Sequence, residues 1–369
     1  MMAAQSKTTP IDANVMKQMI KEAGCFGEKM EELIGRFSKL TSNDPPRFGP
    51  KLGDKIEDYK VLVRIGSGNS DVFAAEWDDG GLFAVKCAPK YINLKREFEI
   101  AKHCWPYSNL LKCLLYGEKE NYNYLIEELT GDDLHTFLIN PKKDCNLKEI
   151  CKTLYEALKA IQQFHVLKFL HQDVKLENFA INLKNPAYVK LIDYGHSASI
   201  GRDGMCTEGR IGTFQFSSQS WLYCIIYAAK ETLLEPWCYS VGGDEVKDKI
   251  LDQKKAVWNN PVERLEFLSG LPIQFSHIMD IIEATTPEKP TEYSGIYTLL
   301  QQVITGENYT LMKAQELYFY DAIPLEAEEY HYYMTRNNTI AIIKGNIRYF
   351  RTDKCVKYCN GILRNFLCK

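Results

Sequence analysis

Apolar and polar residues alternate in short runs between about residue 58 and residue 130. Alternation with a period of two is typical of half-buried strands, and glycine pairs between such runs mark turns. The pattern predicts five strands, at Tyr59–Ile65, Asp71–Ala75, Leu82–Lys86, Leu111–Tyr116 and Tyr122–Glu127. Gly80-Gly81 is a candidate hairpin turn before the third strand, and one helix is expected around Lys95–His103.

From about residue 147 onward the pattern is mainly helical. The expected helices are Leu147–His165, Trp221–Leu234, Val246–Trp258, Val262–Leu268, Phe275–Ala284 and Tyr293–Ile304. A β-rich half followed by a helical half predicts an α+β fold.

Both ends of the chain depart from this plan. An apolar stripe at three- and four-residue steps predicts a helix within residues 11–40, which either packs on the following domain or binds a partner. Prolines and glycines then mark residues 41–54 as a linker. Near the C-terminus, Thr339–Ile343 and Ile347–Phe350 flank a Lys-Gly-Asn turn and predict a β-hairpin.

Composition narrows the class of protein. The 369 residues are 45% hydrophobic and 25% charged, with a formal net charge of −3, as in an ordinary globular protein without a nucleic-acid partner. The 12 cysteines are scattered, which indicates reduced thiols and a cytoplasmic or nuclear location. The sequence shows no signal-peptide pattern and no apolar run of membrane-spanning length, so we expect no membrane association. The oligomeric state is not predicted.

Two polar loops carry the candidate chemistry. Residues 171–178 read HQDVKLEN, and residues 191–195 read LIDYG. This spacing resembles the catalytic loop and the metal-binding turn of protein kinases. By that resemblance Asp173 accepts the proton of an attacking hydroxyl and Lys175 offsets phosphoryl charge. Asn178 and Asp193 would then supply oxygen ligands to Mg²⁺. The alternative is an ordinary polar loop between a helix and a strand.

A candidate phosphate site precedes these loops. Gly66, Ser67 and Gly68 lie between two predicted strands, where glycines let backbone N–H groups approach phosphate oxygens. Lys86 is expected to hold the phosphates and Glu97 to pair with it, although a surface ion pair is the alternative. The third glycine of the pattern is missing. If the nearby Asp71 points inward, it should repel phosphate and weaken nucleotide binding.

The connection between the two halves reads LIEELTGDDL from Leu125. Backbone groups of Glu128, Leu129 and Thr130 are expected near an adenine edge. Glu127 falls at the gatekeeper position, which is usually apolar, unless the register is one residue off.

The motif set is similar to the casein kinase I group, including its vaccinia-related members. The resemblance rests on HQDVK, NFAI, GTFQFSS at residues 212–218, the LIDYG turn and the PW at residues 236–237. It implies a bilobal protein-kinase fold over residues 58–310, with a small lobe to about 130, a helical extension and linker before it, and a tail after it. It also implies ATP and Mg²⁺ as cosubstrate and cofactor, and serine or threonine residues of proteins as acceptors.

Two departures keep an alternative open. Gln172 replaces the usual arginine, so no activation-loop phosphate should be needed. Ser218 runs almost directly into Trp221, where relatives have a longer acceptor-binding stretch. The chain is therefore predicted to be an active serine/threonine kinase or a pseudokinase scaffold. A small-molecule or lipid kinase is the remote third interpretation.

Overall fold

The computed structural model describes residues 21–24, 46–78, 80–139, 145–201, 214–230, 244–286, 289 and 291–306, and five strands between residues 332 and 365. Contacts divide the chain into two compact units, residues 1–140 with 156–212 and residues 141–155 with 213–369. Each unit is described by itself. The predicted domain boundaries near residues 57, 130 and 310 stay predictions.

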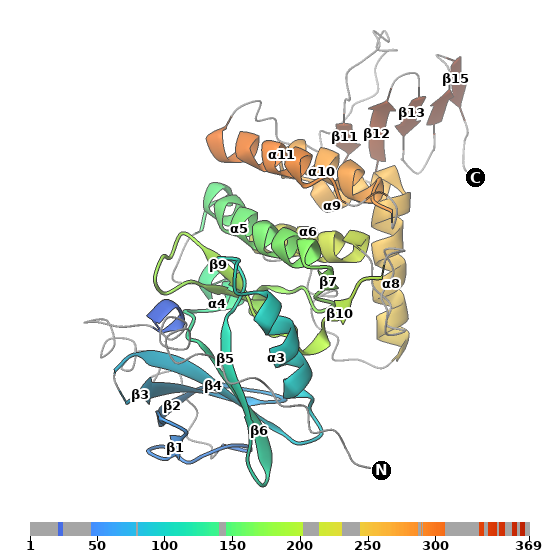
Figure 1. Cartoon of the computed structure of the whole chain (residues 1–369). Coiled ribbons are helices and arrows are strands. Elements are labelled where there is room, and N and C mark those ends of the chain that lie inside the picture. Colours follow the sequence, from blue (N-terminus) through green and yellow to red (C-terminus); the bar gives the residue numbers. More distant parts are fainter. Residues whose placement is uncertain are drawn as a thin grey trace. The chain divides into compact units, whose positions relative to one another are not determined.

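The first unit is built on a six-stranded antiparallel sheet with the order β1-β2-β3-β4-β6-β5 (Figure 1). Its strands are β1 (Lys55–Ile56), β2 (Tyr59–Ser67), β3 (Asp71–Trp77), β4 (Leu82–Pro89), β5 (Cys113–Glu118) and β6 (Tyr122–Glu128). The five predicted strands are confirmed, and helix α3 (Leu94–His103) packs against β5 and β6. The Gly80-Gly81 turn is confirmed as well, since both glycines have positive φ.

The two faces of this sheet bury different sets of side chains. One face packs around Phe73, Phe83, Val85, Tyr124 and Ile126. The opposite face carries Lys86 together with an apolar cluster that includes Ala74, Ala84 and Leu129. The strict alternation of β-strand side chains therefore separates the structural core from the face that holds the candidate site.

Residues 46–54, predicted as a linker, are tied to the sheet. The buried Asp71 carboxylate accepts hydrogen bonds from the backbone N–H groups of Arg47 (2.7 Å) and Phe48 (2.8 Å). Gly49 has φ +104°, and a Cβ there would lie 2.9 Å from Cys87 Cβ, so only glycine fits this approach. The predicted helix within residues 11–40 lies outside the described residues except for 21–24, of which 21–23 are helical.

Short elements follow β6 and hold the polar loops. They are α4 (Leu134–Leu138), α5 (Leu147–Val166), β7 (Phe169–Leu170), β8 (Phe179–Ile181), β9 (Val189–Leu191) and β10 (Ala198–Ser199), with 3₁₀ turns at Leu176–Asn178 and Tyr194–His196. β7 pairs with β10 and β8 pairs with β9, both antiparallel. The boundary between the two units falls within α5.

The second unit is mainly helical. Its further helices are α6 (Phe214–Lys230), α8 (Asp244–Asn259), α9 (Pro261–Leu268), α10 (Gln274–Glu283) and α11 (Tyr293–Thr305). The predicted helices are confirmed to within two residues at their ends, except that α6 begins at Phe214, seven residues before the predicted start at Trp221, and its predicted end at Leu234 lies outside the described residues. Trp221 is fully buried and donates from Nε1 to the Leu154 carbonyl (2.9 Å), which anchors α6.

The C-terminal strands form a five-stranded antiparallel sheet in chain order (Figure 1). They are β11 (Tyr332–Thr335), β12 (Thr339–Lys344), β13 (Ile347–Phe350), β14 (Val356–Cys359) and β15 (Ile362–Asn365). β12 and β13 pair as predicted for the hairpin. Among the helices that the structure describes, none has the length and apolar character needed to cross a membrane.

Candidate functional site

The predicted site residues gather within the first unit. Lys86 lies on β4, Glu97 on α3, and the two polar loops follow β7 and β9. Distances between these side chains can therefore be stated within one unit.

Lys86 is the centre of this arrangement. Its Nζ lies 2.8 Å and 2.9 Å from the two oxygens of Glu97, and 2.8 Å from Oδ1 of Asp193. The predicted Lys86–Glu97 pair is confirmed, and it is buried rather than a surface pair, with exposed fractions of 8% and 2%. Burial alone would lower the pKa of Lys86, but the Glu97 and Asp193 carboxylates raise it above its usual range. Lys86 is thus a permanent cation on the sheet face.

Asp193 sits in a constrained turn. Its backbone has φ 60°, in the left-handed region, and its carboxylate accepts from the Gly195 N–H (3.4 Å). Burial would raise the pKa of Asp193, but the Lys86 ammonium lowers it to about 2. The next residue, Tyr194, is fully buried and donates its N–H to Glu97 (3.1 Å). The turn is therefore fixed to helix α3 at the same carboxylate that holds Lys86.

The second loop brings Asp173, Lys175 and Asn178 together. Asn178 Nδ2 donates to the Asp173 carbonyl (2.7 Å) and to its Oδ2 (2.8 Å), and Lys175 Nζ lies 2.8 Å from the same Oδ2. Burial would raise the pKa of Asp173, but these two donors lower it below its usual value. Asp173 is consequently an ionised acceptor at neutral pH.

The backbone ties the two loops to each other. The Ile192 N–H donates to the Asn178 carbonyl (2.9 Å), next to the pairing of β8 with β9. His171, buried and with a pKa lowered mainly by burial, contacts the Ile192 carbonyl through Nε2 (2.9 Å). Asn178 and Asp193 are thus held side by side in the fold although 15 residues separate them.

The structure removes the concern about Asp71. Its carboxylate does not point toward a phosphate site but is 1% exposed, where it pairs with Arg64 (3.3 Å) besides the two backbone donors of the N-terminal segment. Gly66 and Ser67 are the last residues of β2, opposite Val72 and Asp71 of β3. A Cβ on Gly68 would meet no atom within 4 Å, so no neighbouring group crowds the tip of this hairpin.

The connecting segment has an apolar and a charged part. Leu129 is 3% exposed and belongs to the apolar cluster, whereas the Glu128 carboxylate is buried in an ion pair with Lys190 (2.8 Å). The Glu128 carboxylate is thus already paired, and the expected contact with a nucleotide is one of its backbone groups. Glu127 lies opposite Ala84 and is 6% exposed, so its side chain is buried on the same face of the sheet as Lys86.

Sequence reasoning expected Leu129 near an adenine edge but missed the other apolar residues beside Lys86, namely Val72, Ala84 and Leu183. The cluster with Ala84 and Leu129 is edged by partly buried Val72 and Leu183. Val72 is paired with Lys86 across β3 and β4, and Ala84 lies two residues before Lys86 on the same face. That two-residue spacing is the signal that could have found Ala84. Together these apolar residues form an apolar surface suited to a flat aromatic base.

The donor set fits Mg²⁺. The contacts of Asn178 Nδ2 with Asp173 fix the amide, so its oxygen and the Asp193 carboxylate are hard oxygen ligands from two adjoining loops. No group of three or more His, Cys, Asp or Glu side chains within the described ranges forms a metal site. Two protein oxygens are what Mg²⁺ needs when phosphates and water complete its shell.

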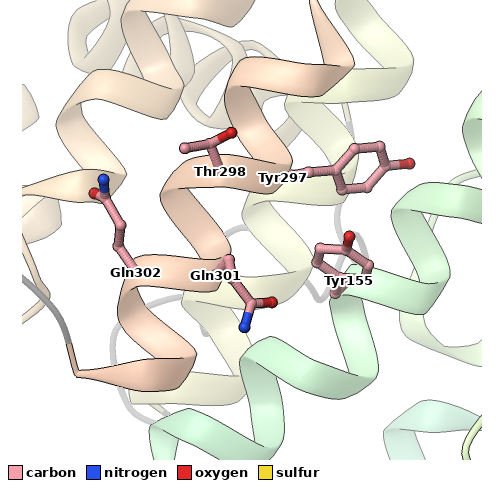
Figure 2. A pocket seen from close by; sticks show the side chains of 5 residues that line it. All are labelled: Tyr155, Tyr297, Thr298, Gln301 and Gln302. Carbon is pink, nitrogen blue, oxygen red and sulfur yellow. The ribbon is translucent and has the colours of Figure 1, made fainter.

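A hollow in the second unit does not share these features (Figure 2). It has a volume of about 370 Å³ and is lined by Tyr155 on α5 and by Tyr297, Thr298, Gln301 and Gln302 on α11. The rings of Tyr155 and Tyr297 lie 4.7 Å apart at 48°. Its lining has neither a carboxylate nor a basic group, so it offers no general base and no anion partner.

Comparisons with known proteins agree with this geometry. The family model described as the protein kinase domain matches residues 59–241. The serine/threonine-protein kinase spe-6 of Caenorhabditis elegans is 27% identical over 282 residues, covering 69% of this chain and 73% of that protein. A putative serine/threonine-protein kinase of the same organism is 29% identical over 282 residues, covering 68% of this chain and 79% of its own length. The chain therefore carries a protein kinase domain with the bilobal α+β fold, related at modest identity to serine/threonine kinases.

Proposed function

We propose that this chain is an active serine/threonine protein kinase that transfers the γ-phosphoryl group of ATP to hydroxyl groups of proteins, with Mg²⁺ as cofactor. The observation that carries the proposal is the buried Lys86–Glu97 pair, joined at 2.8 Å to Asp193. Membership of the casein kinase I group, and a cytoplasmic or nuclear location, are part of the same proposal. They rest on the sequence motifs and the cysteines.

Different residues would bind the adenine, the phosphates and the metal ion. An adenine base would lie on the apolar surface of Val72, Ala84, Leu129 and Leu183, with backbone groups of residues 128–130 at its edge. Lys86 would hold phosphate oxygens, and Asn178 and Asp193 would hold Mg²⁺, which would neutralise charge on the phosphates.

Asp173 acts on the acceptor. Its carboxylate takes the proton of a serine or threonine hydroxyl as the oxygen–phosphorus bond forms and the bond to the ADP leaving oxygen breaks. Lys175, 2.8 Å from Asp173, adds a positive charge at the position where the phosphoryl group moves. Positioning and charge stabilisation, rather than covalent chemistry, are what such a site contributes.

A pseudokinase scaffold is the second candidate function. Two observations favour it. The hairpin at Gly66–Gly68 lacks the third glycine, and the stretch after Ser218 continues α6 instead of forming the longer acceptor segment of relatives. The intact set at positions 86, 97, 173, 175, 178 and 193 favours an active enzyme.

Radiolabelled phosphotransfer to casein and acidic peptides, by the full chain and by Asp173→Asn, tests the proposal. The wild type should transfer phosphate, whereas Asp173→Asn should lose nearly all transfer and keep its thermal shift with Mg-ATP, because Asp173 acts on the hydroxyl. A wild type that binds Mg-ATP but transfers no more than Asp173→Asn would establish the scaffold function instead.

A further inference from the structure

Helix α3 contacts the turn that carries Asp193 (residues 193–197) through two successive side chains. Glu97 accepts a hydrogen bond from the Tyr194 N–H (3.1 Å) near the start of this turn. Arg96, the residue before Glu97, donates from Nη2 to the Ser197 carbonyl at the end of the same turn. Neighbouring residues of α3 therefore hold the turn at both of its ends.

Ser197 joins the Asp193 turn to the strand that follows it. Its N–H donates to the Tyr194 carbonyl (3.0 Å), which closes the turn, and the residue is fully buried. Strand β10 begins at the next residue and pairs with β7, which leads directly into the polar loop at His171. A contact that fixes Ser197 therefore acts on both polar loops of the candidate site.

The chemistry of the Arg96 contact makes it independent of conditions. A guanidinium stays protonated at any physiological pH, and a backbone carbonyl does not titrate. This acceptor is also the same whether or not a serine or threonine of the chain carries a phosphate. Arg96 lies half-buried in the first turn of α3, where its N–H donates to Oδ1 of the capping residue Asn93 (3.0 Å). The helix end that carries the contact is thus itself held in place.

We propose that Arg96 is a positioning residue for phosphoryl transfer, which keeps Glu97 beside Lys86. It does so by holding α3 against the Asp193 turn. The inference rests on the proposed function, because in protein kinases this lysine–glutamate pair must be in place for transfer, and activation-loop phosphorylation is one way to control it. Gln172 replaces the arginine that would bind such a phosphate. The Arg96 contact links α3 to the loops without one.

The first measurement is hydrogen exchange of backbone amides in the full chain without nucleotide, followed by mass spectrometry. Arg96→Met keeps a long aliphatic stem and removes the donor, whereas Arg96→Lys keeps a cationic donor. In Arg96→Met, residues 194–200 should exchange about tenfold faster, the effect of losing one hydrogen bond from a charged group. The amides of β3 and β4 should not change. Arg96→Lys should stay close to the wild type, as should the control Lys95→Met, an exposed neighbour on α3.

The second measurement is the rate of phosphate transfer to casein as a function of Mg-ATP concentration. Arg96 belongs neither to the apolar surface proposed for adenine nor to the loop proposed for the acceptor. Loss of a contact that only orients the reacting groups lowers kcat more than it changes affinity. We expect the kcat of Arg96→Met to fall by about tenfold and its KM for ATP to change by less than about threefold. A purely structural role would leave the kcat of the folded protein unchanged, and Arg96→Lys should restore most of it.

The outcomes separate the inference from the proposed function. Equal exchange of residues 194–200 in Arg96→Met and the wild type overturns the inference whatever the kinetics. Faster exchange with an unchanged kcat overturns it too, because Arg96 would then hold the turn without serving transfer. A rise in exchange that is as large in β3 and β4, or equal defects in Arg96→Met and Arg96→Lys, would also contradict it. If the wild type transfers no phosphate, the proposed function fails, and the exchange data then leave Arg96 a structural contact only.

Discussion

The Lys86 ammonium nitrogen lies 2.8 Å from Oδ1 of Asp193, a residue 107 positions further along the chain. The same nitrogen lies 2.8 Å from Glu97 Oε1 on helix α3. One cation thus joins a strand, a helix and the turn that carries Asp193. Loss of the Lys86 ammonium therefore removes a contact from all three elements, which is the physical basis of the first prediction.

Replacing Lys86 by methionine should abolish the thermal shift with Mg-ATP, because no cation remains for the phosphates. It should also lower the free energy of unfolding by about 3 kcal/mol, since Glu97 is left as a buried carboxylate without its partner. Both effects can be read from thermal melts and urea titrations. Lys55→Met removes a lysine whose pair with Asp78 is exposed and should cost less than about 1 kcal/mol. A Lys86→Met protein that keeps the Mg-ATP shift would contradict the site assignment.

Much of this site follows from the sequence because its signals are local. Period-two alternation gives β2 to β6, and the loop spacing places Asp173, Lys175, Asn178 and Asp193. The position of Asp71 could not be predicted, since its backbone partners lie 23 and 24 residues earlier in a proline- and glycine-rich stretch. The start of α6 was missed for a similar reason. Ser218 is buried against Thr291, 73 residues away, and polar serines otherwise look like a loop.

Asp71 should contribute to stability and not to nucleotide affinity. Asp71→Ala removes the acceptor of two backbone N–H groups and the carboxylate that pairs with Arg64, which should cost about 3 kcal/mol of unfolding free energy. The dissociation constant for MgADP should stay within about twofold, because the carboxylate is turned away from Lys86. Asp78→Ala, at an exposed site, is the control and should cost less than about 1 kcal/mol. Tighter nucleotide binding by Asp71→Ala would revive the repulsion hypothesis.

Glu128 and Lys190 form a buried ion pair that should behave as a unit. Their side chains are 5% and 3% exposed, and Lys190 Nζ also donates to the Leu110 carbonyl (3.3 Å). Lys190→Met alone leaves the Glu128 carboxylate buried without this partner and should lower the free energy of unfolding by about 3 kcal/mol. Glu128→Leu alone should have an effect of the same size. The double variant should recover most of that loss, because both buried charges are gone. A double-mutant cycle in urea measures the coupling, and additive losses would show that the pair does not act as a unit.

His165 should make the protein sensitive to acid. Burial lowers the pKa of His165 to about 3, against an ordinary value near 6.5. Between these pH values His165 is protonated in the unfolded chain but neutral in the folded chain. The free energy of unfolding therefore falls as pH falls from 6.5 toward 3. His165→Gln should reduce that slope by about 1.4 kcal/mol per pH unit, measured as urea unfolding at pH 4.5, 5.5 and 6.5. The exposed His277→Gln variant should keep the wild-type slope.

The stretch after Ser218 gives the last prediction. Relatives are expected to have a longer acceptor segment here, and an insertion between Ser218 and Ser220 would restore its length. In the structure, however, this position lies inside α6. Each residue added to a helix rotates the remainder of the helix by about 100°. Two added residues would turn Trp221 away from the Leu154 carbonyl, or Ser218 away from Thr291.

Such an insertion should therefore lower the free energy of unfolding by about 4 kcal/mol or more, the cost of displacing a fully buried tryptophan. The matched control inserts the same residues directly before Phe214, where the helix begins and both contacts are kept. That control should melt like the wild type.

If acceptor length limits activity, the control insertion should also lower the KM for casein severalfold at unchanged affinity for MgADP, since the proposed nucleotide contacts come from the first unit. Equal stability of the two insertion variants would show that residues 214–220 do not form the start of α6. A stable control with unchanged casein phosphorylation would show that the short segment is not the defect, and the scaffold alternative would lose that support.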